Sequence, residues 1–398
     1  MLICFMTFNA EEIEQFRKDT AGTSRVIHLN NAGAALPPNE VRDVVLEYLK
    51  EEALVGGYEL SRQRNKELEE TYAVIAKLIS AKPSEIALVE NATAAWQAAF
   101  YSIDWKPGDE LICNRSDYAS NYLSYLHHPS KPKVHVLPND QQGDVDLEAL
   151  KNSIGPRTRL VSITHMPTNS GQLAPAEEIG VLCKEKGVFY LLDACQTVGQ
   201  YPLDVNQLHC NFLSATGRKY LRGPRGTGFL YVREATMPKI RPYVVDLHSA
   251  EWIGEADYEV KASAQKFENW EGNRATQLVL KQAAAYAMHI GVPKIWQRIT
   301  ELAAYTRIKM ADLPHVSCHD LGTQLGGIVS FTVRGYSADA VMQALAQQRI
   351  NVSWNGRSNT YLDMTEKGLE EIVRCSVHYY NTEEEIDQFI DALKKFGK

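Results

Sequence analysis

Short runs of apolar residues recur through the middle of the chain at the spacing of buried strands. Their bounds are 110–113, 134–137, 160–164, 188–192 and 228–232. Segments with the 3.6-residue period of a helix lie between several of them, for example 175–186, which Gly187 ends. Strands that alternate with helices in this way favour a mainly parallel sheet with helices on both faces. The pattern therefore predicts an α/β fold.

The pattern changes after residue 273, where helical periods become longer and strands fewer. Helices are expected at 275–290, 292–313, 338–348 and 382–396, and a strand at 326–333. This predicts a second, smaller α+β domain. We expect three parts: an N-terminal segment, 1–29, that packs with the small domain, a large domain at 30–275, and the small C-terminal domain at 276–398.

The overall charge argues against a polyanionic partner. Lysine and arginine number 42, and aspartate and glutamate 49, so the formal net charge is −7. This sign gives no support to a nucleic acid or an anionic membrane as partner, and a small molecule is the expected ligand. The apolar start at 1–16 has no basic leader and is too short for a membrane span. We therefore expect a cytoplasmic protein.

Seven cysteines occur at irregular spacing, without the paired pattern of a zinc site. They are Cys4, Cys113, Cys183, Cys195, Cys210, Cys318 and Cys375. Several lie inside apolar runs, so we expect reduced core thiols and no bound metal, as is usual in the cytoplasm.

Polar groups able to bind a ligand follow several of the predicted strands, where ligands bind in open α/β sheets. The polar stretches are 90–96, 117–121, 164–171 and 193–196. Lys219 lies between a further apolar run, 211–213, and the run at 228–232. Taken singly, each group has an ordinary structural explanation. Asn91 can be a helix cap and Tyr118 a packed ring, while Asp193 and Lys219 can be structural charges that have partners.

One cofactor would use these groups together. A helix N-terminus behind Asn91 binds a phosphate, and Tyr118 offers an aromatic face. Asp193 would pair with a protonated ring nitrogen, and Lys219 would react with an aldehyde. Pyridoxal 5′-phosphate carries all four groups. A dinucleotide is a poorer fit, because GPRGTG at 223–228 lacks the G-x-G-x-x-G spacing and leads into a strand, and no G-x-x-x-x-G-K-[ST] occurs.

Three motifs, taken with their order along the chain, resemble those of the class V aminotransferase and cysteine desulfurase family of fold-type I pyridoxal-phosphate enzymes. His28-Leu29-Asn30-Asn31-Ala32-Gly33 resembles the family's L-D/N-N-A-A/G, Asp193-Ala194-Cys195-Gln196 its D-G/A-x-Q, and Thr216-Gly217-Arg218-Lys219 its S-G-H-K. The resemblance covers nearly the whole chain. It implies a large domain with a mainly parallel, seven-stranded sheet that binds the cofactor.

The resemblance also implies roles for individual residues. Lys219 would hold the cofactor covalently through its aldehyde, and Asp193 would pair with the ring nitrogen. Gln196 and Thr168 would reach the ring hydroxyl, and Tyr118 would stack on the ring. The implied phosphate ligands are Ala92, Thr93, Thr216 and Arg218. The implied substrate ligands are Arg374, which clamps the carboxylate, and Asn31, in the first motif.

Lys219 must be an uncharged amine to attack an aldehyde. Partial burial and the neighbouring guanidinium of Arg218 both lower the proton affinity of such an amine. Once the substrate frees it, the same amine can move the α-proton of the substrate. The structural interpretation of Lys219 becomes the weaker one.

The reaction type follows from departures from the desulfurase pattern. Desulfurases carry a nucleophilic cysteine on a loop before the carboxylate-binding arginine, and here the stretch 352–360 has none. Tyr118 and Arg218 each replace a histidine. The string around Lys219 is most similar to C–S lyases such as hercynylcysteine sulfoxide lyases, and to epimerase-like members. We therefore expect β-elimination from an S-substituted cysteine or its sulfoxide, giving pyruvate and ammonia.

Other activities stay open on the sequence alone. They are a cysteine desulfurase with a displaced thiol, a class V transaminase or epimerase, and an inactive relative that serves as a binding protein. The intact Lys219, Asp193 and Arg374 disfavour the last. Arg357 and Asn355 are candidates for recognising the leaving group, with solvated loop residues as the alternative.

The resemblance further implies a homodimer whose active site lies at the subunit interface. Asn273, in the stretch 267–274, falls where the family's partner chain contributes to phosphate binding. The alternative is an exposed loop that begins a helix.

Overall fold

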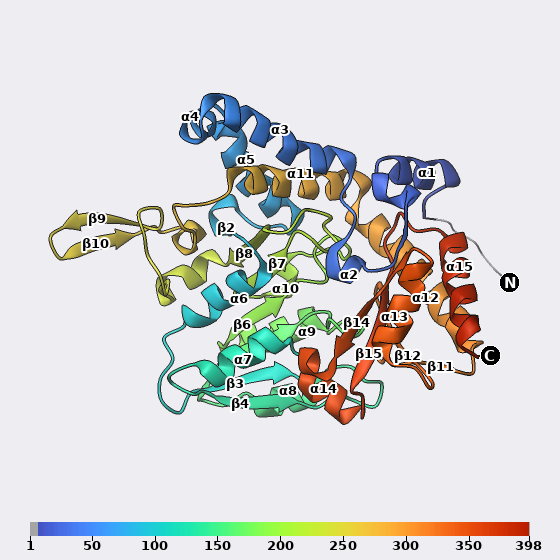
Figure 1. Ribbon diagram of the computed structural model, residues 1–398. Coiled ribbons are helices and arrows are strands. Elements are labelled where there is room, and N and C mark those ends of the chain that lie inside the picture. The colour runs from blue at the N-terminus through green and yellow to red at the C-terminus, as the bar shows by residue number, and fades with distance from the viewer. Residues whose placement is uncertain (1–6, 398) are drawn as a thin grey trace.

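The computed structural model describes residues 7–397 and has an α/β fold, as expected (Figure 1). The first six residues, with Cys4 and most of the apolar start, lie outside the described residues, and so does Lys398. Within residues 7–397, no helix is both long and apolar enough to cross a membrane.

A seven-stranded sheet forms the centre of the larger part of the molecule, with the order β2-β8-β7-β6-β5-β3-β4. Its strands are β2 (Ile86–Val89), β3 (Glu110–Asn114), β4 (Lys133–Leu137), β5 (Thr158–Thr164), β6 (Phe189–Asp193), β7 (Phe212–Thr216) and β8 (Gly228–Val232). Only β8 runs against its neighbours, because it follows β7 through a short glycine-rich turn. The sheet is therefore mainly parallel, which confirms the expectation.

The sheet is packed on both faces. Ile112 points into one hydrophobic core, and its neighbours Leu111 and Cys113 point into the other, as the two-residue period of a strand requires. Trp96 and Phe100 fill the second core and stack with ring centroids 5.0 Å apart. Apolar side chains cover both faces, so ligands reach the sheet only at strand ends.

Two predicted helices of this part, 175–186 and 275–290, agree with the structure to within one residue, and the other helices had no predicted bounds. The helices around this sheet are α2 (Asn31–Ala34), α3 (Asn39–Val55), α4 (Gly57–Gln63), α5 (Asn65–Leu78), α6 (Ala92–Tyr101), α7 (Ala119–His127), α8 (Leu147–Ser153), α9 (Ala176–Lys186), α10 (Val205–Leu208) and α11 (Arg274–Ile290). Helices α3, α4, α5 and α11 form a layer at the top of Figure 1 and share the small core of Tyr48, Leu60, Leu68, Ala275 and Leu278.

A smaller antiparallel sheet lies beside the large one, with the order β11-β12-β15-β14. Its strands are β11 (Val316–Cys318), β12 (Ile328–Val333), β14 (Ser353–Gly356) and β15 (Glu371–Ser376), and nearby lie β13 (Ile350–Asn351) and the helices α12 (Val292–Ala311), α13 (Ala338–Gln347), α14 (Tyr361–Glu366) and α15 (Glu383–Lys394). Two predicted bounds need correction. The strand expected from 326 starts at Ile328, after the glycine pair at 326–327. The helix expected from 382 starts one residue later, because Thr382 is its N-cap in a capping box with Glu385.

The N-terminal segment contacts the smaller sheet. Its helix is α1 (Ala10–Lys18), and its strand β1 (Ile27–His28) pairs in parallel with β13. Arg17 forms an ion pair of 2.7 Å with Glu385 on α15. The division of the chain at 29 and 275 stays an interpretation, since α11 packs on α3 and α5 and then leads directly into α12.

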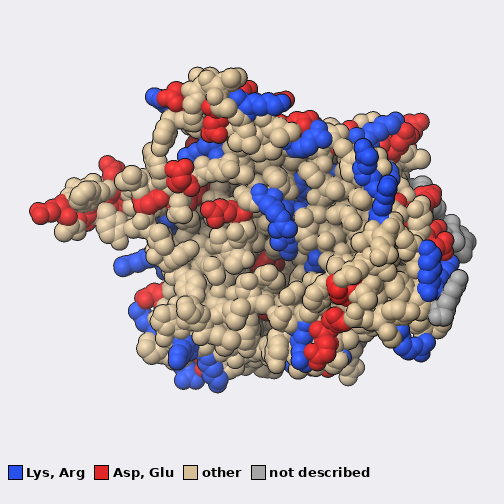
Figure 2. Space-filling view, viewed as in Figure 1, with Lys and Arg blue, Asp and Glu red and all other residues tan. Residues whose placement is uncertain are grey.

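A two-stranded hairpin, which the sequence pattern did not predict, projects from the body of the molecule. It consists of β9 (Ala250–Gly254) and β10 (Asp257–Val260), and Figure 2 shows it standing clear of the remaining surface. Trp252, Ile253 and Tyr258 are exposed on it, with Trp252 at 77%. A hairpin with no core of its own and exposed aromatic residues suggests an interaction surface.

Candidate active site

A cavity of about 510 Å³ lies at the carboxyl ends of the parallel strands. Nine of the predicted site residues line it: Ala92, Thr93, Tyr118, Thr168, Asp193, Gln196, Thr216, Arg218 and Lys219. It is also lined by Glu90, Asn91, Asn121, Thr164, Met166, Cys195, Arg225 and Gly226. The residues that the sequence brought together thus share one cavity, although they come from distant parts of the chain.

The first turn of α6 forms one end of the cavity. Asn91 caps this helix, and its side-chain oxygen accepts a hydrogen bond of 2.9 Å from the amide of Ala94. The helix start is an anion site, because its first N–H groups have no partner within the helix. Gly228 lets β8 pass this close, since a Cβ there would lie 2.9 Å from the backbone of Asn91.

Asp193 lies at the end of β6 and is 5% exposed. Its Oδ1 accepts a hydrogen bond of 3.0 Å from the amide of Cys195, and its Oδ2 accepts one of 3.1 Å from Nδ2 of Asn121. Burial raises the pKa of Asp193, and these two hydrogen bonds oppose the rise. Among residues 7–397 it forms no ion pair, so this carboxylate is available for a cationic group of a ligand.

Lys219 lies in the turn between β7 and β8 and is 8% exposed. The turn is fixed by hydrogen bonds from the amide of Arg222 to the carbonyl of Lys219, 2.9 Å, and from the amide of Gly217 to that of Thr227, 2.9 Å. Burial lowers the pKa of Lys219, and the charge of Arg218 lowers it further. The structure therefore confirms the direction expected from the sequence and favours the neutral amine.

Three other predicted residues of the cavity wall differ in their partners. Thr216 donates a hydrogen bond of 3.1 Å to the carbonyl of Thr227, and Arg218 donates to the carbonyl of Gly33. Gln196 is buried, and its side-chain oxygen has no protein partner. An unpaired buried amide oxygen is costly, so Gln196 fits a ligand hydroxyl.

Arg374 lies on β15 and is 4% exposed. It donates hydrogen bonds of 2.7 and 2.9 Å to the hydroxyl and the carbonyl of Thr168, and one of 3.4 Å to Asn30, while its Nε has no partner. Burial lowers the pKa of Arg374 to about 10. Within the described chain this guanidinium has no carboxylate partner, so the arrangement suits an anionic ligand.

Two predicted substrate residues lie near Arg374 in different ways. With its amide oxygen turned toward Arg374, Asn355 accepts a hydrogen bond of 3.3 Å from that guanidinium. Asn31 instead donates hydrogen bonds of 3.1 and 2.8 Å to the carbonyls of His28 and Ser376. Asn31 therefore holds the N-terminal segment against β15 and does not line the cavity.

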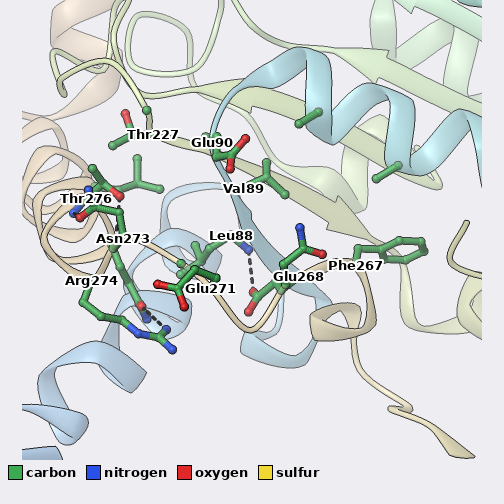
Figure 3. Close-up of a pocket in the computed structure, with 18 of the residues that line it drawn as sticks. Leu88, Val89, Glu90, Thr227, Phe267, Glu268, Glu271, Asn273, Arg274 and Thr276 are labelled. Carbon is green, nitrogen blue, oxygen red and sulfur yellow. Dashed lines mark hydrogen bonds between the residues drawn. The ribbon is translucent and has the colours of Figure 1, made fainter. Parts of the chain in front are cut away.

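Arg357 and Asn273 lie away from the cavity. Arg357 forms an ion pair of 2.9 Å with the exposed Glu370, as a solvated surface residue does. Asn273 caps α11 by accepting a hydrogen bond of 3.1 Å from the amide of Thr276, and it lines a neighbouring cavity of about 220 Å³ (Figure 3). Glu90 and Gly226 line both cavities, so the cavity that contains Asn273 adjoins the active-site cavity.

Sequence reasoning missed several residues of the cavity wall. Asn121 and Thr164 lie in polar stretches that the sequence singled out, but only the packing of α7 on the sheet shows that they meet near Asp193. Cys195 was expected to be a core thiol, and it lines the cavity instead. Arg225 lies in the glycine-rich turn and lines the cavity. Its position in the sequence does not indicate which way its side chain points.

Comparison with known proteins identifies the family. The family model for aminotransferase class-V matches residues 27–389. This chain belongs to the aminotransferase class-V family. A "Probable cysteine desulfurase" of Pyrococcus abyssi is 27% identical over 394 residues, covering 97% of this chain and 98% of the relative. One from Synechocystis is 29% identical over 389 residues, covering 93% and 90%.

Solved structures of other proteins have the same fold as this class-V family member. The apo cysteine desulfurase of Thermococcus onnurineus NA1 superposes with a TM-score of 0.89 at 26% identity, covering 96% of this chain and 97% of the other. The cystine C–S lyase C-DES, in complex with its product cysteine persulfide, gives 0.84 at 23% identity, covering 95% and 100%, and shows the fold alone.

Membership of the aminotransferase class-V family confirms the cofactor expected from the sequence. The class V enzyme described here depends on pyridoxal 5′-phosphate, and its cavity fits that group. The cavity contains a helix N-terminus for the phosphate, a carboxylate without an ion-pair partner for the protonated ring nitrogen, and a buried lysine for the aldehyde.

Cys195 provides a first test of this cavity. Burial raises the pKa of its thiol, so alkylation by iodoacetamide should be slow at pH 7 and accelerate as the pH rises. Pyridoxal phosphate should protect Cys195 because both occupy the same cavity. The exposed Cys318 is the control and should react equally with and without cofactor; protection of both thiols, or of neither, would contradict this placement.

Proposed function

We propose that this enzyme acts on an α-amino acid as a β-eliminating C–S lyase, with an S-substituted cysteine or its sulfoxide as substrate and pyruvate and ammonia as products. The observation that carries the proposal is the composition of the chain beside Arg374. Ser353 on β14 is the direct cross-strand partner of Arg374. The stretch 352–360, where desulfurases carry their nucleophilic cysteine, thus adjoins the carboxylate clamp and offers Asn355 in place of a thiol.

The cavity, together with Arg374, which contacts its lining residue Thr168, supplies what elimination requires. Arg374, held by Thr168 and Asn30, would bind the substrate carboxylate and so orient the Cα–H bond. Lys219, whose pKa is lowered, would accept the α-proton as a neutral amine. When bound, the cofactor supplies an electron sink for the pair left by that proton. No protein thiol is needed, because the sulfur group leaves with the electron pair of the Cβ–S bond.

Other residues would hold the cofactor in place. Asp193 would keep the ring nitrogen protonated, and Tyr118 would cover one ring face. Gln196 and Thr168 would contact the ring hydroxyl. The proposed phosphate ligands are Ala92, Thr93, Thr216 and Arg218.

A cysteine desulfurase is the second candidate, and one observation favours it. Cys195 is the only cysteine within residues 7–397 that lines the cavity, and the curated relatives named above are described as desulfurases. In this reaction a thiolate attacks the substrate sulfur, the Cβ–S bond breaks, and the products are alanine and a persulfide on the protein. The raised pKa of Cys195 weakens this candidate, because the thiolate is scarce at neutral pH.

The proposed role of Lys219 predicts a covalent attachment. The wild-type protein with pyridoxal phosphate should show a visible absorbance band that borohydride removes while it fixes the cofactor to Lys219, as peptide mass would show. Lys219→Ala should lack both the band and the attachment. Lys281, a partly exposed lysine on α11, is the control: Lys281→Ala should label normally. Attachment at any other lysine would refute the assignment.

The products separate the candidate reactions. The enzyme is incubated with cysteine, cystine and S-substituted cysteine sulfoxides, and pyruvate, alanine and protein persulfide are measured. We expect pyruvate without alanine, and Cys195→Ser should retain the activity. Alanine together with a persulfide that Cys195→Ser abolishes would establish the desulfurase instead. A keto acid that keeps the whole side chain would indicate a transaminase, and an inverted substrate an epimerase.

We also propose that the chain forms a homodimer. The β9–β10 hairpin extends away from the body (Figure 1). Trp252 and Tyr258 are exposed on it, and Leu49, Tyr58 and Trp270 add further exposed apolar surface. Apolar surface of this extent is typical of an interface. Tyr58 and Trp270 line an open groove that also contains Asn273, which supports the prediction that Asn273 reaches the phosphate of the partner subunit.

Sedimentation velocity tests the dimer. Wild-type protein should sediment as a dimer at micromolar concentration, and Trp252→Asp together with Tyr258→Asp should shift it toward the monomer, because burying two charges at an interface is costly. Leu321→Asp, at an exposed site of the smaller part of the molecule, should leave the dimer intact. A wild-type monomer with full activity would refute the proposal.

A further inference from the structure

A second buried carboxylate, Asp117, lies behind Asp193. It follows β3, precedes α7, and is 4% exposed. Its Oδ1 accepts three hydrogen bonds: 2.8 Å from the amide of Tyr118, 3.0 Å from Nδ2 of Asn121 and 2.7 Å from Oγ1 of Thr164. All three donors belong to residues that line the active-site cavity. Oδ1 of Asp117 therefore binds three residues of the cavity wall at once.

The same amide group joins Asp117 to Asp193. Nδ2 of Asn121 carries two hydrogens, and it lies 3.0 Å from Oδ1 of Asp117 and 3.1 Å from Oδ2 of Asp193. Turning the amide over would place its oxygen against two carboxylates, which is unfavourable. Asp117 thus fixes the direction in which Asn121 donates to Asp193.

This donation matters because of the environment of Asp193. Burial raises its pKa, and the hydrogen bonds from Cys195 and Asn121 are the two largest opposing influences. They occupy one position on each carboxylate oxygen. If Asn121 lost its orientation, Asp193 would hold its negative charge less firmly and would pair less well with a protonated ring nitrogen.

We propose that Asp117 is a positioning residue, which holds Asn121 on Asp193 and Tyr118 at the ring face, and so sets the protonation of the cofactor ring. The proposal rests on the pairing of Asp193 with the ring nitrogen proposed above. Asp117 contacts neither cofactor nor substrate. It acts through the three cavity residues that donate to its Oδ1.

The groups that face Asp117 are consistent with a carboxylate that works as an acceptor. They are Cys113 on β3, Tyr122 and Tyr125 on α7, and Asp193 on β6. Oδ2 of Asp117 accepts a hydrogen bond of 2.7 Å from the hydroxyl of Tyr125. Burial raises the pKa of Asp117 to about 6, against its hydrogen bonds, so it is ionised at pH 7 and above.

The test compares Asp117→Ala, Asn121→Ala and the double variant. Cofactor affinity is measured by equilibrium dialysis, and the pH midpoint of ring-nitrogen protonation is measured by NMR titration of protein that holds pyridoxal phosphate labelled at that nitrogen. Each single variant should bind pyridoxal phosphate about 10- to 100-fold more weakly, the range found when outer partners of ligating groups are removed. Each should also lower the pH midpoint, because the ring nitrogen then loses its proton more easily. The double variant should be no worse than the singles.

Two further variants separate positioning from general stability. Asp117→Asn keeps an oxygen that accepts the same three hydrogen bonds, so it should restore most of the affinity. Asn114 is the matched control, because its buried amide binds the backbone of Thr164 at 3.1 Å without contacting Asp193. Asn114→Ala should lower the melting temperature and leave the affinity and the midpoint unchanged.

Several outcomes would overturn the proposal. Additive effects of Asp117→Ala and Asn121→Ala would mean that the two residues act independently. A lower melting temperature with unchanged affinity and midpoint would make Asp117 a structural residue only. If Asp117→Ala does not fold, Asp117→Ser, whose shorter side chain cannot reach all three donors, takes its place in the comparison with Asn121→Ala. An unchanged midpoint in Asp193→Asn would show instead that the underlying pairing is wrong.

Discussion

The active site depends on the burial of ionisable groups that lack partners of opposite charge. Asp193, Lys219 and Arg374 are each at least nine-tenths buried, and within residues 7–397 none forms an ion pair. Such burial costs free energy that the surrounding hydrogen bonds offset only in part. The cofactor has a cationic ring nitrogen that can pair with Asp193 and an aldehyde that can react with Lys219. The substrate has a carboxylate that can pair with Arg374. The site therefore favours ligands that supply partners for these three buried groups.

The two sheets divide this work. Strand ends of the large sheet hold the residues proposed to bind the cofactor, and β15 of the small sheet holds Arg374. Thr168 connects them, because it lines the cavity and accepts two hydrogen bonds from Arg374. The position of Arg374 relative to Lys219 thus depends on how the small sheet packs on the loop after β5.

The sequence predicted the strands of the large sheet well, because their apolar runs are continuous and end at turn residues. It also indicated Asp193, because an acid directly after such a run is unusual, and Lys219, because a lysine between two buried strands is unusual. It could not predict that Asn121 lies between Asp117 and Asp193, because that contact depends on how α7 packs against β5 and β6. Asn31 was expected at the substrate, yet its hydrogen bonds join two distant backbone segments. The β9–β10 hairpin escaped prediction because its strands are short, are exposed on both faces and contain no continuous apolar run.

The pairing of β1 with β13 has a consequence for biosynthesis. A ribosome delivers residues 27–28 more than three hundred positions before their partners at 350–351, so the first segment has no strand to join while the large sheet is already complete. Contacts of such high sequence separation form late. The motif that contains Asn30 and Asn31 can reach Arg374 only after β15 has emerged. In the proposed function, the arginine that binds the substrate carboxylate is thus positioned after the strands that would bind the cofactor, and a chain that ends before β15 lacks it.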